Sequence, residues 1–186
     1  MSAALNCNIG FIGGGNMAQA LIGGLISRGL PPTRITVSDP VERVRSLLAE
    51  KEVNVTDDNR AAIKNADIVV FAVKPQVLAE VLKPLQGLLD GKLVISIVAG
   101  AEIATLSALL GTDRIVRVMP NTPALVQTGA HGLFAKDEVK AEDRELASQV
   151  LASTGLTIWV DSEAQIDAVT AVSGSGPAYF FYMMES

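Results

Sequence analysis

The stretch Ile9-Gly10-Phe11-Ile12-Gly13-Gly14-Gly15-Asn16-Met17-Ala18 decides the fold of this chain. Its start reads as a strand, and a helix is expected to follow from Asn16 to Ser27. Gly13, Gly15 and Ala18 match the pattern G-x-G-x-x-G/A. In that pattern the glycines permit a tight turn and the approach of a pyrophosphate, which the start of the helix binds. A turn with a purely topological role is the alternative, but three adjacent glycines are entropically costly. The stretch therefore predicts a dinucleotide-binding loop.

The rest of the chain alternates short β-branched runs with helical patterns, as βαβ units around a parallel sheet do. Strands are expected at 9–12, 34–38, 53–55, 67–73, 93–98 and 114–119, and added strands at 130–134 and 156–160. Helices are expected at 16–27, 40–51, 58–65, 103–110 and 141–153, and from Pro75 toward Leu89 with an interruption near Pro84. The apolar run Ile68 to Val73 predicts a central strand covered on both faces. The fold class predicted is α/β: a Rossmann-like, doubly wound, mostly parallel sheet with extra strands.

The pattern becomes helical from Ser162 onward. Ser162 and Gln165 form a plausible capping box for a helix through Val172. The stretch Ser173-Gly174-Ser175-Gly176-Pro177 is expected to break this helix, and a second, apolar helix is expected at 178–184. We therefore expect a nucleotide-binding domain at 1–161 and the truncated beginning of an all-α domain at 162–186. Because the apolar helix needs a packing partner, a weak or swapped dimer of the chain is possible.

Composition and charge limit the classes of partner. The chain has 186 residues, of which 49% are hydrophobic and 19% charged, as expected for one core plus an appendage. A net charge of −5 without a stripe of Lys and Arg argues against a nucleic-acid partner. The longest apolar run, 68–73, is too short to span a membrane. A single cysteine, Cys7, and no targeting pattern in Met1 to Asn8 predict a cytoplasmic protein.

The end of the second expected strand bears on the choice between NAD and NADP. Asp39 lies 24 positions after Gly15, where a carboxylate binds the adenosine ribose of NAD. Ser38 and Arg43 could instead receive the 2′-phosphate of NADP, which a carboxylate would repel. Asp39 could also serve only as the N-cap of a helix that begins at Pro40. These residues leave NADPH and NADH both open.

Four further segments resemble a known family. They are Phe71-Ala72-Val73-Lys74-Pro75, Arg117-Val118-Met119-Pro120-Asn121-Thr122-Pro123, Ile166-Asp167-Ala168-Val169-Thr170 and Ser173-Gly174-Ser175-Gly176-Pro177-Ala178-Tyr179. With the glycine-rich stretch, their order and spacing resemble pyrroline-5-carboxylate reductase over essentially the whole chain. The resemblance implies an enzyme that reduces 1-pyrroline-5-carboxylate to L-proline, the last step of proline biosynthesis, by hydride transfer from NADPH or NADH to a cyclic imine carbon.

The resemblance also implies which residues bind the cofactor and the substrate. The implied cofactor-binding residues are Ile12, Gly13, Gly14, Gly15, Asn16 and Met17 at the pyrophosphate, Ser38 and Asp39 at the adenosine ribose or its phosphate, Asn59, Ala72, Val73, Lys74 and Pro75 at the ribose and nicotinamide, and Ile97, Val98 and Ala99 after the next strand. The family generally favours NADPH, so Asp39 is a departure from its pattern. The resemblance places Asn121, Thr122, Pro123 and Glu163 toward the substrate.

Much of the substrate pocket of this family, including a hydroxyl that contacts the ring nitrogen, lies in a helical domain that would follow residue 186. That domain forms an intertwined dimer, so the resemblance implies a homodimer or higher oligomer when it is complete. The active site of this chain is therefore expected to be incomplete.

Three polar residues are candidates for a catalytic role. Lys74 leaves the carboxyl end of a central strand and could attract the substrate carboxylate or bind the nicotinamide ribose. The alternative is a solvated lysine whose backbone begins a helix. Asn121 and Thr122 lie between two prolines that stiffen the loop, and they form either a wall of the site or an ordinary turn.

Other candidates are weaker or absent. Ser175 and Gly176 belong to the segment 173–176, which could offer backbone N–H groups to the substrate carboxylate at a helix start, or act as a hinge between helices. His131 is the only histidine and is expected to be a surface or strand-pairing residue. No set of His, Cys and carboxylate residues has the spacing of a metal site.

Two other functions share some of these features. A related dehydrogenase that acts on a hydroxy acid or a deazaflavin also has the glycine loop and continues into a helical domain. A hydroxy-acid enzyme would need a lysine or histidine base near the substrate carbonyl, which the segment 173–179 does not supply. A non-catalytic module would bind NAD(P)H without turning it over.

Overall fold

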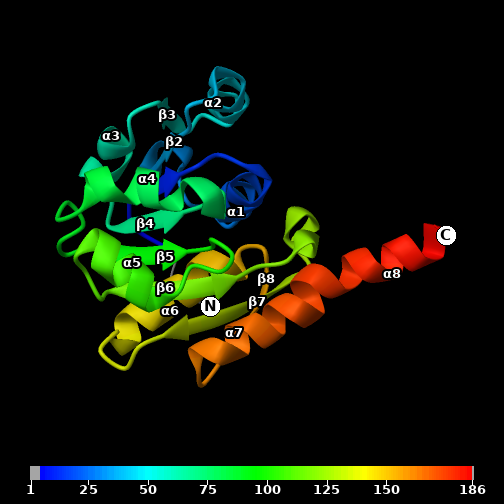
Figure 1. Cartoon of the computed structure of the whole chain (residues 1–186). Coiled ribbons are helices and arrows are strands. Elements are labelled where there is room, and N and C mark those ends of the chain that lie inside the picture. Colours follow the sequence, from blue (N-terminus) through cyan, green and yellow to red (C-terminus); the bar gives the residue numbers. More distant parts are fainter. Residues whose placement is uncertain (1–4, 186) are drawn as a thin grey trace.

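The computed structural model describes residues 5–185, and within them eight strands form one sheet (Figure 1). The first residues of the stretch Met1 to Asn8 and the last position of the expected all-α region lie outside the described residues. The strands are β1 (Ile9–Ile12), β2 (Ile35–Ser38), β3 (Asn54–Thr56), β4 (Ile68–Phe71), β5 (Leu93–Ser96), β6 (Ile115–Met119), β7 (Gly129–Ala135) and β8 (Gly155–Trp159).

The order of the strands in the sheet is β3-β2-β1-β4-β5-β6-β7-β8. The six strands from β3 to β6 pair in parallel, whereas β7 pairs with β6 antiparallel and β8 pairs with β7 in parallel. The order of the six parallel strands is that of a doubly wound dinucleotide-binding sheet. The predicted fold class, including the two added strands, is confirmed.

Helices cover both faces of the sheet. They are α1 (Asn16–Ser27), α2 (Glu42–Ala49), α3 (Asn59–Lys64), α4 (Leu78–Leu82), α5 (Ile103–Leu110), α6 (Ala141–Ala152), α7 (Glu163–Val169) and α8 (Gly176–Glu185), with the 3-10 segments η1 (Pro32–Arg34), η2 (Pro75–Val77), η3 (Lys83–Leu85) and η4 (Thr122–Val126) and the π-helical segment η5 (Thr170–Ser175). Neighbouring residues of one strand reach opposite faces: Phe11 packs with Leu21 of α1, while Ile12 packs with Ile63 of α3. All four residues of β4 are buried, as predicted for a central parallel strand.

The helix predicted from Pro75 toward Leu89 is shorter and more broken than expected. Only Leu78–Leu82 is α-helical, with a 3-10 segment on either side of it. Pro84 lies inside η3, so the predicted interruption is confirmed. A proline has no backbone N–H to donate and its ring clashes with the preceding turn, which explains why the α-helix ends there.

The predicted break between 173 and 177 is wrong. The elements α7, η5 and α8 follow one another without a gap, because the segment Thr170–Ser175 takes a π-helical turn instead of ending the helix. The hydroxyls of Thr170 and Ser173 donate to the carbonyls of Ile166 and Val169, at 2.8 and 2.9 Å. We call the rod formed by α7, η5 and α8 the helical arm, and in Figure 1 its red end projects from the body of the molecule.

Candidate active site

The glycine loop begins directly after β1 and is held between the ends of two neighbouring strands. Gly13 has a φ of +96°, which favours glycine, and its N–H donates to the carbonyl of Ser38 at 2.8 Å. A Cβ on Gly13 would lie 2.6 Å from the carbonyl oxygen of Ala72, at the end of β4. The loop can therefore pass between β2 and β4 only if this residue is a glycine.

The second glycine of the loop is bound by the acidic residue at the end of β2. The N–H of Gly14 donates to Oδ2 of Asp39 at 2.8 Å, and the N–H of Val41 donates to Oδ1 at 2.9 Å. The helix that follows begins at Glu42, with Val41 at its N-cap position. The alternative reading of Asp39 as the N-cap of a helix beginning at Pro40 is therefore wrong, because the carboxylate instead fixes the glycine loop and the turn before α2.

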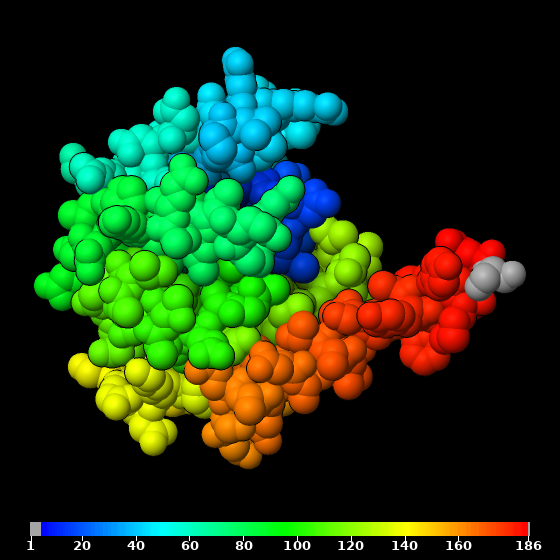
Figure 2. Space-filling view, in the orientation of Figure 1, coloured from blue at the N-terminus to red at the C-terminus, as the bar shows by residue number. Residues whose placement is uncertain are grey.

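The third glycine leaves open space at the start of α1. Nothing lies within 4 Å of a Cβ built on Gly15, whose φ is −65°. The N–H groups of Asn16, Met17 and Ala18 have no acceptor among residues 5–185. Unpaired N–H groups at the positive end of a helix bind anions. In Figure 2 the blue atoms of the N-terminal part of the chain are visible between the cyan α2 region and the yellow-green segment that contains η4.

Two further predicted cofactor residues meet beside this loop. The side chain of Ser38 is buried, and its hydroxyl donates to Oδ1 of Asn59 at 2.6 Å. Asn59 is the first residue of α3 and half-buried. Ser38 and Asn59 therefore lie together at the carboxyl end of β2, as a site for the adenosine half of a dinucleotide requires.

The turns after β4 and β5 reach the same edge of the sheet as the glycine loop. The N–H of Ala72 donates to the carbonyl of Ile12 at 2.8 Å, and the N–H of Ile97 donates to the carbonyl of Phe71 at 3.1 Å. The structure thus brings together the predicted residues that follow these strands, which are Ala72, Val73, Lys74, Pro75, Ile97, Val98 and Ala99. Val98 is buried, whereas Ala99 is exposed.

Lys74 is exposed at the end of this turn. Its backbone carbonyl accepts the N–H of Val77 at 3.2 Å and so begins the segment η2. Its ammonium group makes no hydrogen bond or ion pair with another residue in the range 5–185. The ammonium is thus available to a ligand, and a role in catalysis stays a prediction.

The loop that contains Asn121 and Thr122 follows β6 at the same edge. Oδ1 of Asn121 accepts the N–H of Ala130 at 2.9 Å, which ties the loop to β7. The segment η4 packs against α1, the helix that begins at the glycine loop. Thr122 is exposed. The loop is therefore fixed beside the helix that begins at the glycine loop, and the roles of both side chains toward a substrate stay predictions.

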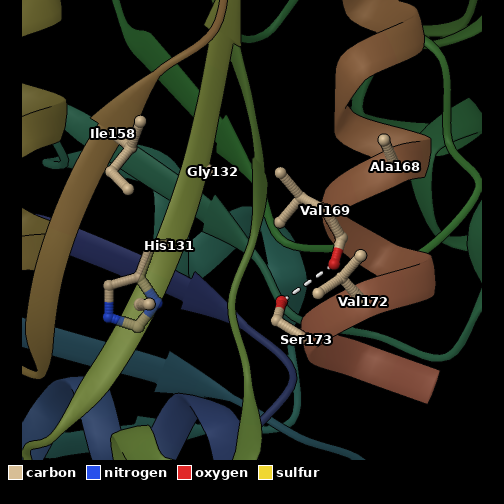
Figure 3. Close-up of a pocket in the computed structure, with 8 residues that line it drawn as sticks. His131, Gly132, Ile158, Ala168, Val169, Val172 and Ser173 are labelled. Carbon is tan, nitrogen blue, oxygen red and sulfur yellow. Dashed lines mark hydrogen bonds between the residues drawn. The ribbon is translucent and has the colours of Figure 1, made fainter. Parts of the chain in front are cut away.

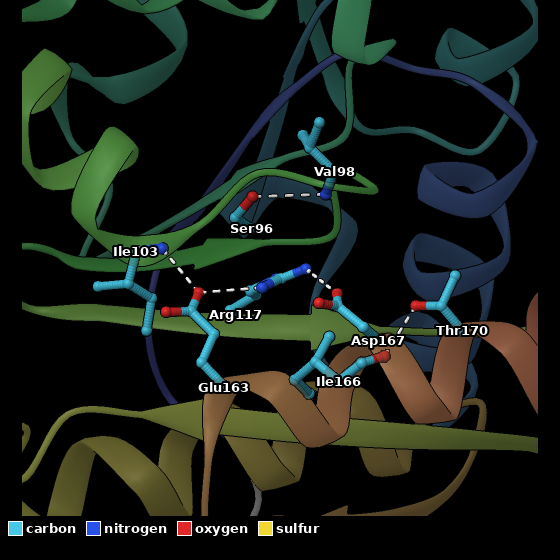
Figure 4. Close-up of polar contacts among 8 residues, drawn as sticks. All are labelled: Ser96, Val98, Ile103, Arg117, Glu163, Ile166, Asp167 and Thr170. Atoms are coloured by element: carbon cyan, nitrogen blue, oxygen red, sulfur yellow. Dashed lines mark hydrogen bonds and ion pairs between the residues drawn. The ribbon is translucent and has the colours of Figure 1, made fainter.

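Glu163 belongs to an ion-pair network around the buried Arg117 that sequence reasoning missed (Figure 4). Its Oε1 accepts the N–H of Ile103 at 2.8 Å and Nη1 of Arg117 at 3.1 Å, while Nη2 of Arg117 donates to Asp167 at 2.9 Å. The Arg117 side chain is only 3% exposed. This network fixes the start of the helical arm to the sheet. The signal for it in the sequence was Arg117 itself, because a charged residue between two apolar residues of a buried strand needs a partner of opposite charge.

The helical arm passes the end of β6 at its π-helical segment. A Cβ on Gly174 would lie 3.0 Å from Cε of Met119. Ser175 and Gly176 are close to this contact, but they lie inside a continuous helix. The expectation that 173–176 offers backbone N–H groups at a helix start is therefore wrong, because N–H groups inside a helix point toward its preceding turn.

The only histidine lies on β7, which faces the helical arm across an apolar groove (Figure 3). His131 is in β7, as predicted, but it is 1% exposed and not on the surface. Its Nε2 is 3.0 Å from Oγ1 of Thr154, its Nδ1 has no partner, and burial lowers its pKa. It lines an open apolar groove of about 350 Å³ with Ile158 and Val172. The ring is buried on the face of the sheet opposite to α7, against Thr154 in the turn after α6, because Gly132, the next residue of β7, is the one that faces Val169 of α7.

Within residues 5–185, no three side chains of His, Cys, Asp or Glu gather as the ligands of a metal ion would. No helix of the described part is both long enough and apolar enough to cross a membrane.

Comparison with known proteins agrees with this arrangement of loops. Residues 8–100 match a family described as NADP oxidoreductase coenzyme F420-dependent, and residues 163–186 match a family described as pyrroline-5-carboxylate reductase dimerisation. A pyrroline-5-carboxylate reductase of Pseudomonas aeruginosa is 50% identical over 181 residues, covering 96% of this chain and 66% of the relative. The chain thus spans about two thirds of the length of such relatives.

Solved structures show that the fold of this chain is also similar to that of known proteins. A pyrroline-5-carboxylate reductase of Coxiella burnetii superposes with a TM-score of 0.91 at 44% identity, over 97% of this chain and 68% of that one. This chain belongs to the pyrroline-5-carboxylate reductase family. A pyrroline carboxylate reductase of Plasmodium falciparum, solved with NADP bound, has a TM-score of 0.85 at 31% identity, over 97% of this chain and 67% of that one. The pyrroline-5-carboxylate reductase resemblance expected from the sequence is therefore confirmed.

Proposed function

We propose that this chain is the cofactor-binding part of a pyrroline-5-carboxylate reductase, which reduces 1-pyrroline-5-carboxylate to L-proline with NADH or NADPH. The observation that carries the proposal is the open space at Gly15, with three unpaired N–H groups after it, at the edge where the turns after β4, β5 and β6 also end. Family membership supports the choice of reaction.

The residues at this edge fit a dinucleotide. The start of α1 offers N–H donors and the space that a pyrophosphate needs. Asp39 offers a carboxylate at the end of β2, where a ribose is bound in this fold. The turns at 72–75 and 97–99 combine half-buried Val73 and Ile97 with the buried Val98, and such an apolar wall suits one face of a nicotinamide ring.

In the proposed reaction NAD(P)H supplies the hydride. The glycine loop and Asp39 hold the dinucleotide, and the turns after β4 and β5 orient its nicotinamide end and exclude water. The Lys74 ammonium attracts the substrate carboxylate, and Asn121 fixes the loop that presents the Thr122 hydroxyl. A protonated imine is already electrophilic, so this edge needs no strong general acid.

We further propose that the arm contributes to the substrate side. Ser175 and Gly176 remain candidates for substrate contact because η5 passes the end of β6 at this edge. Glu163 supports that contact through Arg117, which fixes the arm to the sheet. We divide the chain into a nucleotide-binding domain at 1–161 and a helical region at 162–186, and we propose a homodimer, formed through that region, that acts in the cytoplasm.

A second candidate function is reduction of a deazaflavin. It is favoured by the match of residues 8–100 to the family described as coenzyme F420-dependent. The match of residues 163–186 to the pyrroline-5-carboxylate reductase dimerisation family favours the imine instead.

The test is oxidation of NADH and NADPH, followed by absorbance at the nicotinamide band, on addition of 1-pyrroline-5-carboxylate or of the deazaflavin. The assay uses this chain and a chimera in which the remaining third of the Pseudomonas aeruginosa relative follows it. Rapid loss of NAD(P)H with the imine alone is the expected result. If the chimera binds either cofactor but consumes neither substrate, the protein is a nucleotide-binding module and the proposal is wrong.

A further inference from the structure

We propose that Asp39 makes this site selective for NADH over NADPH. Its carboxylate binds the free ribose hydroxyls of NADH and excludes the 2′-phosphate of NADPH. The inference rests on the proposed function for its use in turnover, although the selectivity itself is a property of cofactor binding.

The carboxylate of Asp39 is held rigidly beside the phosphate-binding loop. Each oxygen accepts one backbone N–H, from Gly14 at 2.8 Å and from Val41 at 2.9 Å, and the residue is 9% exposed. Gly14 directly precedes Gly15, the point where a pyrophosphate can approach. A dinucleotide bound at Gly15 therefore brings its adenosine ribose to the end of β2, within reach of Asp39.

The charges around Asp39 do not offset its carboxylate. No ion pair joins it to a basic residue within residues 5–185. Arg45 is the basic residue that contacts Asp39, and its Nη1 donates to the backbone carbonyl at 2.7 Å, not to the carboxylate. A phosphate carries about 1.5 to 2 negative charges at neutral pH, so it would be repelled at this position.

The hydroxyl of Ser38 does not offer a hydrogen bond that would offset this repulsion of a 2′-phosphate. Ser38 is the residue that would donate to it, but its hydroxyl has a single proton and gives it to Oδ1 of Asn59 at 2.6 Å. The side chain is also 1% exposed. In the sequence, Ser38 and Arg43 were the two candidates to bind a 2′-phosphate. Of these, only Arg43, which is exposed on α2, still has a free donor among residues 5–185.

Ribose hydroxyls suit the same geometry. Each carboxylate oxygen has a second lone pair after it accepts its backbone N–H, so it can still accept from a diol. A hydrogen bond to a charged acceptor strengthens binding by about tenfold to a hundredfold. The carboxylate thus contributes to NADH binding and opposes NADPH binding with the same two atoms.

Binding measurements without substrate test the inference. The dissociation constants of NADH and NADPH are measured through the fluorescence of the nicotinamide, for the unmodified chain and for Asp39→Asn, Asp39→Ser and Glu50→Gln. We expect the unmodified chain to bind NADH at least about tenfold more tightly than NADPH. Asp39→Asn should reduce this ratio by about tenfold, by weakening NADH and strengthening NADPH. Glu50→Gln removes one charge at the far end of α2 and should leave the ratio unchanged.

A second measurement needs no variant. In the unmodified chain, AMP, which has a free ribose diol, should displace NADH at a lower concentration than 2′,5′-ADP does. Thermal unfolding without cofactor shows whether each variant is folded.

Two results would overturn the inference. One is equal or tighter binding of NADPH by the unmodified chain. The other is an equal loss of affinity for both cofactors in folded Asp39→Asn, which would make Asp39 only a tie for the glycine loop. Because no imine is present, NADH selectivity without turnover would support this inference while the proposed reaction failed.

Discussion

The glycine loop and the helical arm differ in how well their polar and apolar groups are packed against the rest of the chain. In the loop, Gly13 and Gly14 each donate to a partner from β2 or its end, and the apolar residues of β1 are buried. In the arm, the large apolar residues of α8 are from 61% to 74% exposed. A loop that is already packed needs only its ligand, whereas an exposed apolar helix needs another protein surface. Cofactor binding should therefore be a property of the sheet and its loops, and substrate binding should depend on what covers the arm.

The largest expected effect comes from two neighbouring glycines that the structure treats differently. Gly13→Ala places a Cβ 2.6 Å from a carbonyl oxygen at a positive φ, so we expect a loss of about 3 kcal/mol in the free energy of unfolding. Gly15→Ala meets no atom within 4 Å and should change that free energy by less than about 0.5 kcal/mol. It should nevertheless weaken NADH binding by about tenfold, because the methyl group occupies the space of the pyrophosphate. Urea unfolding and fluorescence titration measure the two quantities.

The matched control for these variants is Gly100→Ala. Gly100 also has a positive φ, of 71°, but a Cβ there would meet nothing within 4 Å. If Gly100→Ala is as destabilising as Gly13→Ala, then backbone conformation and not the contact with β4 explains the effect.

The next effect concerns the attachment of the arm to the sheet. Arg117→Ala removes a guanidinium that is 3% exposed and leaves the carboxylates of Glu163 and Asp167 without it. Because Asp167 is 70% exposed, we expect a loss of about 2 kcal/mol, below the range for a fully buried pair. Hydrogen exchange should accelerate in α7 more than in β1. Equal protection of α7 in both proteins would mean that apolar packing alone holds the arm.

A smaller effect on the free energy of unfolding is expected from a change of pH, through His131 in β7. Burial lowers the pKa of His131 below its usual value, near 6.5. Below that pH the unfolded chain takes up a proton that the folded chain does not, so stability should fall as the pH falls from 7.5 to 5.5. His131→Gln should flatten this part of the curve. Unchanged slopes in urea unfolding at the two pH values would show that other groups are responsible.

The smallest effect on stability is expected at the arm's free surface. Phe181 is 61% exposed, so Phe181→Ser should change the free energy of unfolding by less than about 0.5 kcal/mol. The same change should weaken self-association, measured by sedimentation over a range of protein concentrations. A large loss of stability at low concentration would mean that the arm packs against its own sheet in solution.

The sequence predicts the parts of this molecule whose signals are local. The glycine stretch after β1 and the apolar run of β4 each lie within ten residues, and both were predicted at nearly their observed positions. The contacts that were missed span long separations. Arg117 reaches Glu163 and Asp167, which are 46 and 50 positions away, and no local pattern records such a pair.

Two features depend on contacts that the local sequence does not record, and one of them is an error of prediction. Ser173 to Pro177 carries every local signal of a helix end, yet a wider π-helical turn keeps the helix going. His131 pairs with Thr157 of β8, as the strand-pairing prediction requires, but its burial depends on Thr154, which contacts the ring from the turn after α6. Neither the continuous helix nor the burial of His131 follows from the local sequence alone.

The antiparallel direction of β7 decides where the arm points. Since β8 runs alongside β7, the chain leaves the sheet near the edge opposite the glycine loop, and α7 must return across β6 and β7 before α8 can begin. This return carries α8 outward past Met119, on the side of the sheet edge where the cofactor loops end (Figure 1). If β7 and β8 had run parallel to β6, the chain would have left the sheet at the edge of the glycine loop, and the arm would have pointed toward the opposite edge. A protein that packs on the arm would therefore lie on the side of the molecule where the turns after β1, β4, β5 and β6 end.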